Sequence, residues 1–481
     1  MHVYVRQLPL WIEPVRAFEH IPGARKFLLD SSLAIAELGR WSFLGADPFL
    51  FFTSDENRMW VDCGGSVTES AGDPFRQLSG ILTRYEAAPR DFPPFACGAV
   101  GCFSYDLGRM IEHIPATALR DVLTPDIQLG LYDCTLSFDH ADKRVFICYV
   151  DSGREKAEDW ISRLEHSLPI IADDDEYTRF SGYKETAVRI GREALTGCHS
   201  PITSNFSRDD YLEAIRRVQD YIAAGDVYQV NLAQRFSGEY GGDSWRLYRI
   251  LREINPSPFG CFFGFDDLTL VSVSPERLLR LDSKSRLVET RPIKGTRPRG
   301  TDKIDDERLR NQLAASEKDR AENVMIVDME RNDLGRVCEY GSVHVPELWA
   351  IEAHPNVFQM VSTVRGTLPP GKSPVDLLKA SFPGGSITGA PKVRAMEIIE
   401  EIEPVRRGIY TGSVGYIDFC GNMDLNIVIR SIVRSGERAY FHGGGGILAY
   451  SEPEAEYEET LQKVSGLAAA LKIAGEVGND I

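Results

Sequence analysis

The sequence lacks the long apolar runs, the excess of basic residues and the cysteine pairs that identify several large classes of protein. No stretch approaches about 18 uninterrupted apolar residues, so we expect no membrane-spanning helix. Acidic residues outnumber basic residues by 71 to 54, and the net charge of −17 argues against a nucleic-acid-binding protein. The chain also has no internal repeat of fixed period and no low-complexity tract, so a solenoid is not expected.

The nine cysteines are scattered along the chain, and none has the C-x-x-C spacing of a redox or metal-binding pair. We therefore expect reduced, mostly buried thiols, as in a cytoplasmic protein. The amino-terminus has no basic flank followed by an apolar core, so a signal peptide is not expected. An apolar content of 43% is enough for a large core.

The chain is expected to contain three regions. Residues 1–150 hold short apolar runs separated by Gly, Pro and Asp, which predicts a β-rich amino-terminal region. Residues 151–205 are dominated by charged side chains, which predicts a helix near residues 154–167 and then a linker. Residues 206–475 are predicted to form the main functional domain, because the motifs described below lie there.

The third region opens with a predicted helix and strand. Ser207 is expected to cap the helix, apolar residues follow at helical spacing, and Gly225 ends it. The strand predicted over Val227–Phe236 places Gln229 and Asn231 on the same face. A polar strand face is either solvated or lines a site.

Two pairs of acidic residues lie at helical spacing. Glu307–Met329 is predicted to be one long helix, on which Asp319 and Glu322 share a face. Glu456 and Glu459 have the same spacing on a second predicted helix. Together the pairs could hold one Mg²⁺ ion, which needs oxygen ligands but only one or two direct carboxylates. Either pair alone is better explained by the helix dipole or a solvated helix face.

Two glycine-rich segments could bind an anion. Phe382–Lys392 runs into a predicted helix, where free amides and the positive helix end suit a carboxylate or phosphate. The alternative is a tight loop that needs glycine torsions. Gly443–Gly446 follows a predicted strand, Arg438–Phe441, and permits close approach to a ligand; the alternative is a bulge or flexible turn. Arg430 could bind a carboxylate through two hydrogen bonds, although a lone arginine is more often a surface residue.

Lys294 lies in the segment Pro292-Ile293-Lys294-Gly295-Thr296. A lysine on a strand at the floor of an acidic cleft would act as a nucleophile or a proton carrier.

Six motifs in a fixed order together resemble the chorismate-utilising enzymes over roughly residues 28–470. They are Ala224–Leu232, Ser274–Arg277, Pro292–Thr296, Glu322–Asp328, Gly384–Lys392 and Glu456–Thr460. Leu29–Ser31 and Arg40–Gly45 match the amino-terminal region of the same family. The resemblance implies an α+β fold with four layers, α/β/β/α, built on two large packed antiparallel sheets. It also implies that residues 206–475 form the chorismate-binding catalytic domain.

The motifs also distinguish branches of the family. Lys294 makes the Pro-Ile-x-Gly-Thr motif similar to that of aminodeoxychorismate synthases, whereas anthranilate synthases have alanine there. Gln229 stands where isochorismate and salicylate synthases place a water-activating lysine. The resemblance therefore implies amination of chorismate to 4-amino-4-deoxychorismate, a step of p-aminobenzoate and folate biosynthesis. The alternatives are anthranilate synthase component I and a catalytically silent subunit that binds chorismate or tryptophan.

The resemblance implies a Mg²⁺ cofactor and a set of catalytic residues. Glu322 and Glu459 would bind the ion directly, with Asp319 and Glu456 in support through water. Glu276 would be the general acid for the C4 hydroxyl. Lys294 would attack C2 and form a covalent adduct that ammonia displaces at C4; the alternative is that Lys294 only pairs with a substrate carboxylate.

The substrate contacts and partners are also implied by the resemblance. The substrate-binding groups would be Thr388, Tyr410, Arg430, Lys463 and the amides of Gly444 and Gly446. Asp30 and Ser31 resemble a tryptophan pocket, with an ordinary strand end as the alternative. The chain has no glutaminase motif, so ammonia would come from a separate glutamine amidotransferase subunit or from solution.

The chain departs from the family pattern at two positions. Gln359 stands where many relatives have histidine, and glutamine cannot shuttle a proton. Tyr450 replaces the usual aspartate before the last helix, and the sequence offers no account of this change.

Overall fold

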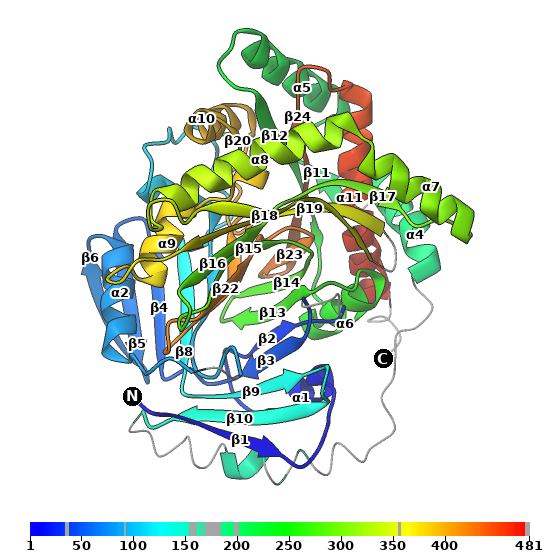
Figure 1. Ribbon diagram of the computed structural model, residues 1–481. Helices are drawn as coiled ribbons and strands as arrows, with labels where there is room; N and C mark the ends of the chain where they lie inside the picture. The colour runs from blue at the N-terminus through cyan, green and yellow to red at the C-terminus, as the bar shows by residue number, and fades with distance from the viewer. Residues whose placement is uncertain are drawn as a thin grey trace.

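The computed structural model describes residues 1–33, 38–90, 93–152, 161–164, 166, 168, 184–196, 202–354 and 357–476. Two twelve-stranded antiparallel sheets form its centre (Figure 1). In each sheet, strands from the first 150 residues form one side and strands from the rest of the chain form the other, so the two parts share one body. No helix among the described residues is long and apolar enough to cross a membrane.

The first sheet carries most of the site described below. Its strands, in spatial order, are β1 (Val3–Leu8), β10 (Arg144–Val150), β9 (Cys134–Asp139), β3 (Trp41–Gly45), β2 (Phe27–Asp30), β13 (Phe259–Phe265), β14 (Leu268–Ser274), β23 (Ser431–Ser435), β24 (Arg438–Ile447), β12 (Gln229–Glu239) and β11 (Ile202–Ser204). The two-residue strand β20 (Gly389–Ala390) also pairs with β12.

The second sheet carries Lys294 on its edge strand. Its order is β17 (Ile293–Pro298), β19 (Val357–Thr367), β16 (Leu287–Arg291), β15 (Arg277–Leu281), β22 (Met423–Asn426), β21 (Ser413–Asp418), β7 (Gly98–Phe103), β8 (Ile127–Tyr132), β4 (Leu50–Asp55), β5 (Arg58–Cys63) and β6 (Ser66–Ala71). Strand β18 (His344–Ala353) pairs with β19.

The helices cover the outer faces of the two sheets. The first sheet packs against α1 (Pro14–His20), α6 (Ser244–Ile254) and α11 (Pro453–Glu476), while α5 (Arg208–Ala223) and α10 (Lys392–Ile402) pack on β12. The second sheet packs against α2 (Pro74–Arg84), α7 (Lys303–Ala314), α8 (Glu317–Gly335) and α9 (Pro374–Ser381). Buried aromatic residues fill the space between the sheets, such as Phe43 of β3 and Tyr416 of β21, whose rings are 5.5 Å apart. The predicted four-layer α/β/β/α fold is confirmed.

Local chemistry explains which helix predictions were correct. The helix after Ser207 is confirmed as α5, and the Ser207 hydroxyl accepts a hydrogen bond from the Asp210 amide. The prediction of one helix over Glu307–Met329 was wrong. The chain forms α7 and α8 instead, because Ser316 interrupts the run and caps α8 by accepting from the Asp319 amide.

Two further predictions differ from the structure. Gly443–Gly446 is not a turn after the predicted strand Arg438–Phe441 but the second half of β24. Within the expected linker, residues 184–196 form the helix α4 (Lys184–Thr196), which lies along α11 (Figure 1). Residues 161–164 are helical, and the remainder of the predicted helix near 154–167 lies mostly outside the described residues.

Helix α4 approaches α11 closely at Gly191. A Cβ atom at Gly191 would lie 1.9 Å from the Ser465 carbonyl oxygen, so an alanine requires the helices to separate. We expect Gly191→Ala to reduce the free energy of unfolding by about 1–3 kcal/mol, as overpacking does. Denaturant unfolding would measure the change. The control is Gly475→Ala, also in a helix, where no atom lies within 4 Å and the effect should be neutral or slightly stabilising. Equal destabilisation by both variants would contradict the contact.

Candidate active site

The candidate site is centred on a four-glycine segment of β24 (Arg438–Ile447). Gly443–Gly446 of β24 pair with Ala233, Asn231 and their neighbours on β12. A Cβ atom at Gly443 would lie 2.8 Å from the Thr460 carbonyl oxygen of α11, and one at Gly444 would lie 2.7 Å from the Leu232 carbonyl oxygen of β12. Helix α11 and strand β12 therefore contact the β24 backbone directly, which only glycine permits.

Helix α11 presents charged groups to this strand. A Cβ atom at Gly445 would lie 3.2 Å from a Glu456 carboxylate oxygen, 3.8 Å from Lys463 Nζ and 3.9 Å from a Glu459 carboxylate oxygen. Lys463 Nζ lies 2.6 Å from Glu459 and donates to the Gly444 carbonyl oxygen at 2.9 Å. The predicted grouping of Glu456, Glu459 and Lys463 on one helix face is confirmed.

Helix α8 brings the second acidic pair toward the same place. Burial raises the pKa of Glu322, and the negative charges of Asp319 and Glu456 add to this shift. Burial also raises the pKa of Glu456, and the charge of Glu459 adds to it. For Glu459, burial acts upward, but the Lys463 ammonium outweighs it and the pKa is lowered. The carboxylates of α8 and α11 thus lie close enough to influence one another.

Lys294 lies among these acids. It is half-buried on β17, and its Nζ would be 3.4 Å from a Cβ atom at Gly446. The charge of Lys294 acts on Glu276, Glu322 and Glu459, so the amine points into the site and not into bulk solvent.

Glu276 lies beside the Lys294 strand and can hold a proton. It is 5% exposed, and its carboxylate accepts from the Ile293 amide at 3.4 Å. Burial raises its pKa, although the Lys294 charge opposes the shift. A buried acid with a raised pKa suits the role of a general acid.

Three of the expected substrate-binding side chains lie together. Tyr410 stacks on His442 at 4.4 Å, and burial raises its pKa to about 12. Arg430 donates to the Lys463 carbonyl oxygen, and its charge acts on both Tyr410 and Lys463. Arg430 has a backbone φ of 54°, an uncommon value for a residue other than glycine that is often found at functional sites.

The other expected contacts are arranged differently. The Thr388 hydroxyl donates to the Gly384 carbonyl oxygen at 2.9 Å. Its proton is therefore used in a hydrogen bond within the glycine-rich loop. The Gln229 amide lies against Gly446, and its buried carbonyl oxygen has no hydrogen-bond partner among the described residues. Gln359 is also buried and its carbonyl oxygen is likewise without a described partner.

The acids do not form a compact metal site in themselves. Within the described ranges, no group of three or more Asp, Glu, His or Cys side chains is arranged to hold an ion. Instead, Asp319 pairs with Arg297 at 2.9 Å, and Lys318 Nζ lies 4.0 Å from Glu322. The donor set nevertheless fits Mg²⁺, because this ion takes one or two carboxylates and retains water, and because Glu322 and Glu456 lie close enough to repel each other.

Asp30 and Ser31 already have partners within the protein. The Asp30 carboxylate accepts from Tyr248 at 2.8 Å and from Arg252 at 2.6 Å. The Ser31 hydroxyl donates to the carbonyl oxygens of Trp41 and Pro258. Both groups therefore stabilise the local structure, and a ligand would have to share these hydrogen bonds.

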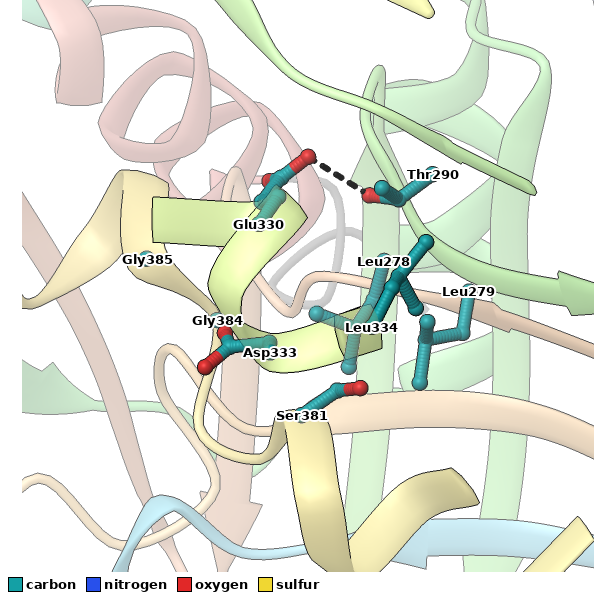
Figure 2. Close-up of a pocket in the computed structure, with 9 residues that line it drawn as sticks. All are labelled: Leu278, Leu279, Thr290, Glu330, Asp333, Leu334, Ser381, Gly384 and Gly385. Carbon is teal, nitrogen blue, oxygen red and sulfur yellow. Dashed lines mark hydrogen bonds between the residues drawn. The ribbon is translucent and has the colours of Figure 1, made fainter. Parts of the chain in front are cut away.

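The sequence reasoning missed a buried acid behind the glycine loop. Glu330 is 6% exposed and faces a cavity of about 10 Å³, the size of one water molecule (Figure 2). Thr290 donates to its carboxylate at 2.9 Å, and the Ser381 hydroxyl on the same cavity has no described partner. The spacing of Val327, Glu330 and Leu334 places Glu330 on the buried stripe of α8, which could have revealed it.

Replacing Glu330 should change how stability depends on pH. Burial raises the pKa of Glu330 well above its usual value; the Thr290 hydrogen bond opposes the shift, and the charges of Glu276 and Asp333 add to it. The folded state therefore binds a proton more tightly than the unfolded state, and the stability contributed below the unfolded pKa of about 4.3 is lost as pH rises toward the folded pKa.

We expect Glu330→Gln, which stays neutral, to gain stability relative to the parent protein as pH increases. Denaturant unfolding at pH 5, 6, 7 and 8 would measure this gain. Glu347→Gln, at an exposed position on β18, should show no such trend. A stability difference that is the same at every pH would contradict the burial argument.

Comparison with known proteins adds independent observations. A family model described as chorismate binding enzyme matches residues 38–469. Aminodeoxychorismate synthase component 1 of Klebsiella aerogenes is 42% identical over 447 residues, covering 92% of this chain and 93% of that protein. Anthranilate synthase component 1 of Thermus thermophilus is 41% identical over 453 residues, covering 93% and 92%. A crystal structure of anthranilate synthase component I from Streptococcus pneumoniae superposes with a TM-score of 0.75 at 29% identity, covering 95% of this chain and 97% of that one.

Proposed function

The chain belongs to the family of chorismate-binding enzymes, and within this family we propose that it aminates chorismate at C4 to give 4-amino-4-deoxychorismate. Relatives of both the aminodeoxychorismate and the anthranilate type match at similar identity, so overall similarity does not choose between the two reactions. The observation that carries the proposal is Lys294, whose amine points into the site from the Pro-Ile-Lys-Gly-Thr strand.

The proposed chemistry has two displacement steps. In the first, the neutral Lys294 amine forms a bond to C2, the two ring double bonds shift, and the C4–O bond breaks. Glu276 gives its proton to the leaving hydroxyl, which departs as water. In the second, ammonia bonds to C4, the double bonds shift back and the C2–N bond to Lys294 breaks. The proton lost by the new amine returns to Glu276, so the cycle is balanced.

A magnesium ion fits the proposal as a cofactor. Glu322 and Glu459 would hold it, with Asp319 and Glu456 supporting it through water. When bound, the ion supplies positive charge that withdraws electron density through the ring carboxylate, which is Lewis-acid assistance.

The remaining residues account for binding and for the exclusion of water as a reactant. Arg430 and Lys463 are cationic, and with Tyr410 they are suited to hold the substrate carboxylates despite the acidic net charge of the protein. Gln229 is a neutral amide and cannot take a proton from water. It therefore favours ammonia over water as the incoming nucleophile.

We further propose that ammonia comes from a separate glutamine amidotransferase subunit, in a reaction that serves p-aminobenzoate and folate synthesis. The names of the relatives as "component 1" agree with a second component. Tryptophan binding at Asp30 and Ser31 remains a prediction.

The product distinguishes this proposal from the nearest alternative. We expect purified protein with chorismate, ammonium and Mg²⁺ to form 4-amino-4-deoxychorismate, which keeps the enolpyruvyl group. Mass analysis would identify this product, and chelation of the metal should abolish its formation. Anthranilate and pyruvate as the main products would instead establish anthranilate synthase activity. No turnover in any of these assays would favour a silent binding subunit.

The role of Lys294 can be tested separately. We expect Lys294→Ala to lower kcat for amination by about 10³-fold or more, because a nucleophile is removed. The exposed Lys372→Ala is the control and should keep the parent rate. Intact-protein mass analysis of the parent enzyme during turnover should reveal the adduct at Lys294. A variant that retains full activity, makes mainly anthranilate, or shows only a raised KM would contradict covalent catalysis.

A further inference from the structure

A further cation lies over the acidic cluster and is not used in the proposed reaction. Lys318, in the first turn of α8, places its Nζ 4.0 Å from a Glu322 carboxylate oxygen. The same Nζ lies over the ring of Tyr450, 5.4 Å from its centroid. Tyr450 belongs to the segment between β24 and α11, so Lys318 bridges the two elements that carry the acids.

Lys318 reaches the acids of both helices. Its charge acts on Glu322 of α8 and on Glu456 and Glu459 of α11. The Tyr450 phenol faces the same group, since after burial the charges of Glu322, Asp319 and Glu456 contribute to raising its pKa. Each of the four predicted cation ligands thus interacts electrostatically with Lys318 or Tyr450.

Two other cations of the site, Lys463 and Arg297, are held more firmly. Lys463 has a 2.6 Å contact with Glu459 and a hydrogen bond to the Gly444 carbonyl oxygen, and Arg297 has a 2.9 Å contact with Asp319. The Lys318 side chain is 52% exposed and its contact with Glu322 is the longest of these, so it can withdraw into solvent at the lowest cost.

A cation at this position has a clear electrostatic consequence. Without a divalent ion, the ammonium relieves the repulsion between the carboxylates. When a divalent ion approaches Glu322, the two cations repel each other and compete for the same oxygen atoms. A positive charge a few ångströms from a binding site weakens the binding of a second cation, and salt screens the effect.

We infer that Lys318 is a built-in competitor of the divalent cation at Glu322, and that the Tyr450 ring holds the competing ammonium over the site. This inference rests on the proposed metal site. It gives Tyr450 a role: an aromatic face attracts an ammonium, whereas a carboxylate at position 450 would add a further anionic ligand. The pair sets the affinity of the site and takes no part in bond making.

Titration of the purified, substrate-free protein with Mg²⁺ alone would test the inference. At low ionic strength we expect Lys318→Met to lower the dissociation constant by about fivefold to tenfold, the effect of removing one partly screened charge. The gain should shrink as salt is added. Lys318→Arg should bind like the parent, because it keeps the charge. Tyr450→Leu should bind Mg²⁺ more tightly than Tyr450→Phe, because both variants lose the hydrogen bond of the phenol to Glu322 and only phenylalanine keeps the ring.

A matched control comes from the far end of α11. Lys472 Nζ lies 3.9 Å from Glu476 at the same i,i+4 spacing, so Lys472→Met removes a similar exposed contact away from the site. Its Mg²⁺ affinity should equal that of the parent. Melting temperatures provide a second measurement: Lys318→Met should melt lower than the parent in EDTA and should gain more from added Mg²⁺.

The outcomes separate this inference from the proposed function. If the parent binds Mg²⁺ and Lys318→Met binds it with unchanged affinity, the competitor role is wrong and the metal site stands. If Lys318→Met changes only the KM for chorismate, Lys318 is a substrate contact and the inference is also overturned. If the parent binds no Mg²⁺ even with chorismate present, the metal site and the inference both fail.

Discussion

The site depends on the absence of side chains along the second half of β24. At Gly443 and Gly444 an added Cβ atom would fall within 3 Å of backbone oxygen atoms of α11 and β12. Any larger residue would force the helix, and with it Glu456 and Glu459, away from the strand. Because Gly446 also leaves room for the Gln229 amide and the Lys294 amine, the same short segment determines how closely the two sheets bring their functional groups together. The pKa shifts of the acidic side chains follow from this close packing.

Close packing gives similar side chains different properties. Glu276 is buried with a cation near but not paired to it, and its pKa is raised. Glu459 is also buried, but Lys463 lies 2.6 Å away and lowers its pKa. One acid is thus suited to hold a proton and the other to remain a carboxylate, which is the usual way in which a single site obtains an acid and an anionic ligand. Arg430 and Lys463 supply local positive charge beside Glu459 in a protein whose net charge is −17.

The sequence predicted local features better than their assembly. The cap at Ser207 and the helix face carrying Glu456 and Glu459 follow from spacing alone, and the structure confirms both. The break before Ser316 was missed because a serine within a polar helical pattern does not reveal that its hydroxyl will cap a new helix. The predicted strand ended at Phe441, before the glycine run that β24 contains, since glycine usually weakens a strand and its role here depends on a helix packed against it. The four-layer arrangement was predicted from family resemblance. Local sequence patterns do not show which distant strands pair, and these pairings bring residues as far apart as Gln229 and Lys463 together.

Close packing of these elements is compatible with more than one reaction. The glycine strand, the two acidic helices and the basic residues are arranged alike for either reaction, and none of them decides which ring carbon receives nitrogen. Relatives named for different products match 92% and 93% of the chain at similar identity. A choice between the two products requires a protein group that acts at one particular carbon atom of the substrate ring. In this site the Lys294 amine comes from the second sheet and lies near Glu276, whereas Lys463 is paired with Glu459 and hydrogen-bonded to the β24 backbone. The proposed choice of product therefore depends on one side chain of an edge strand and not on the scaffold that positions it.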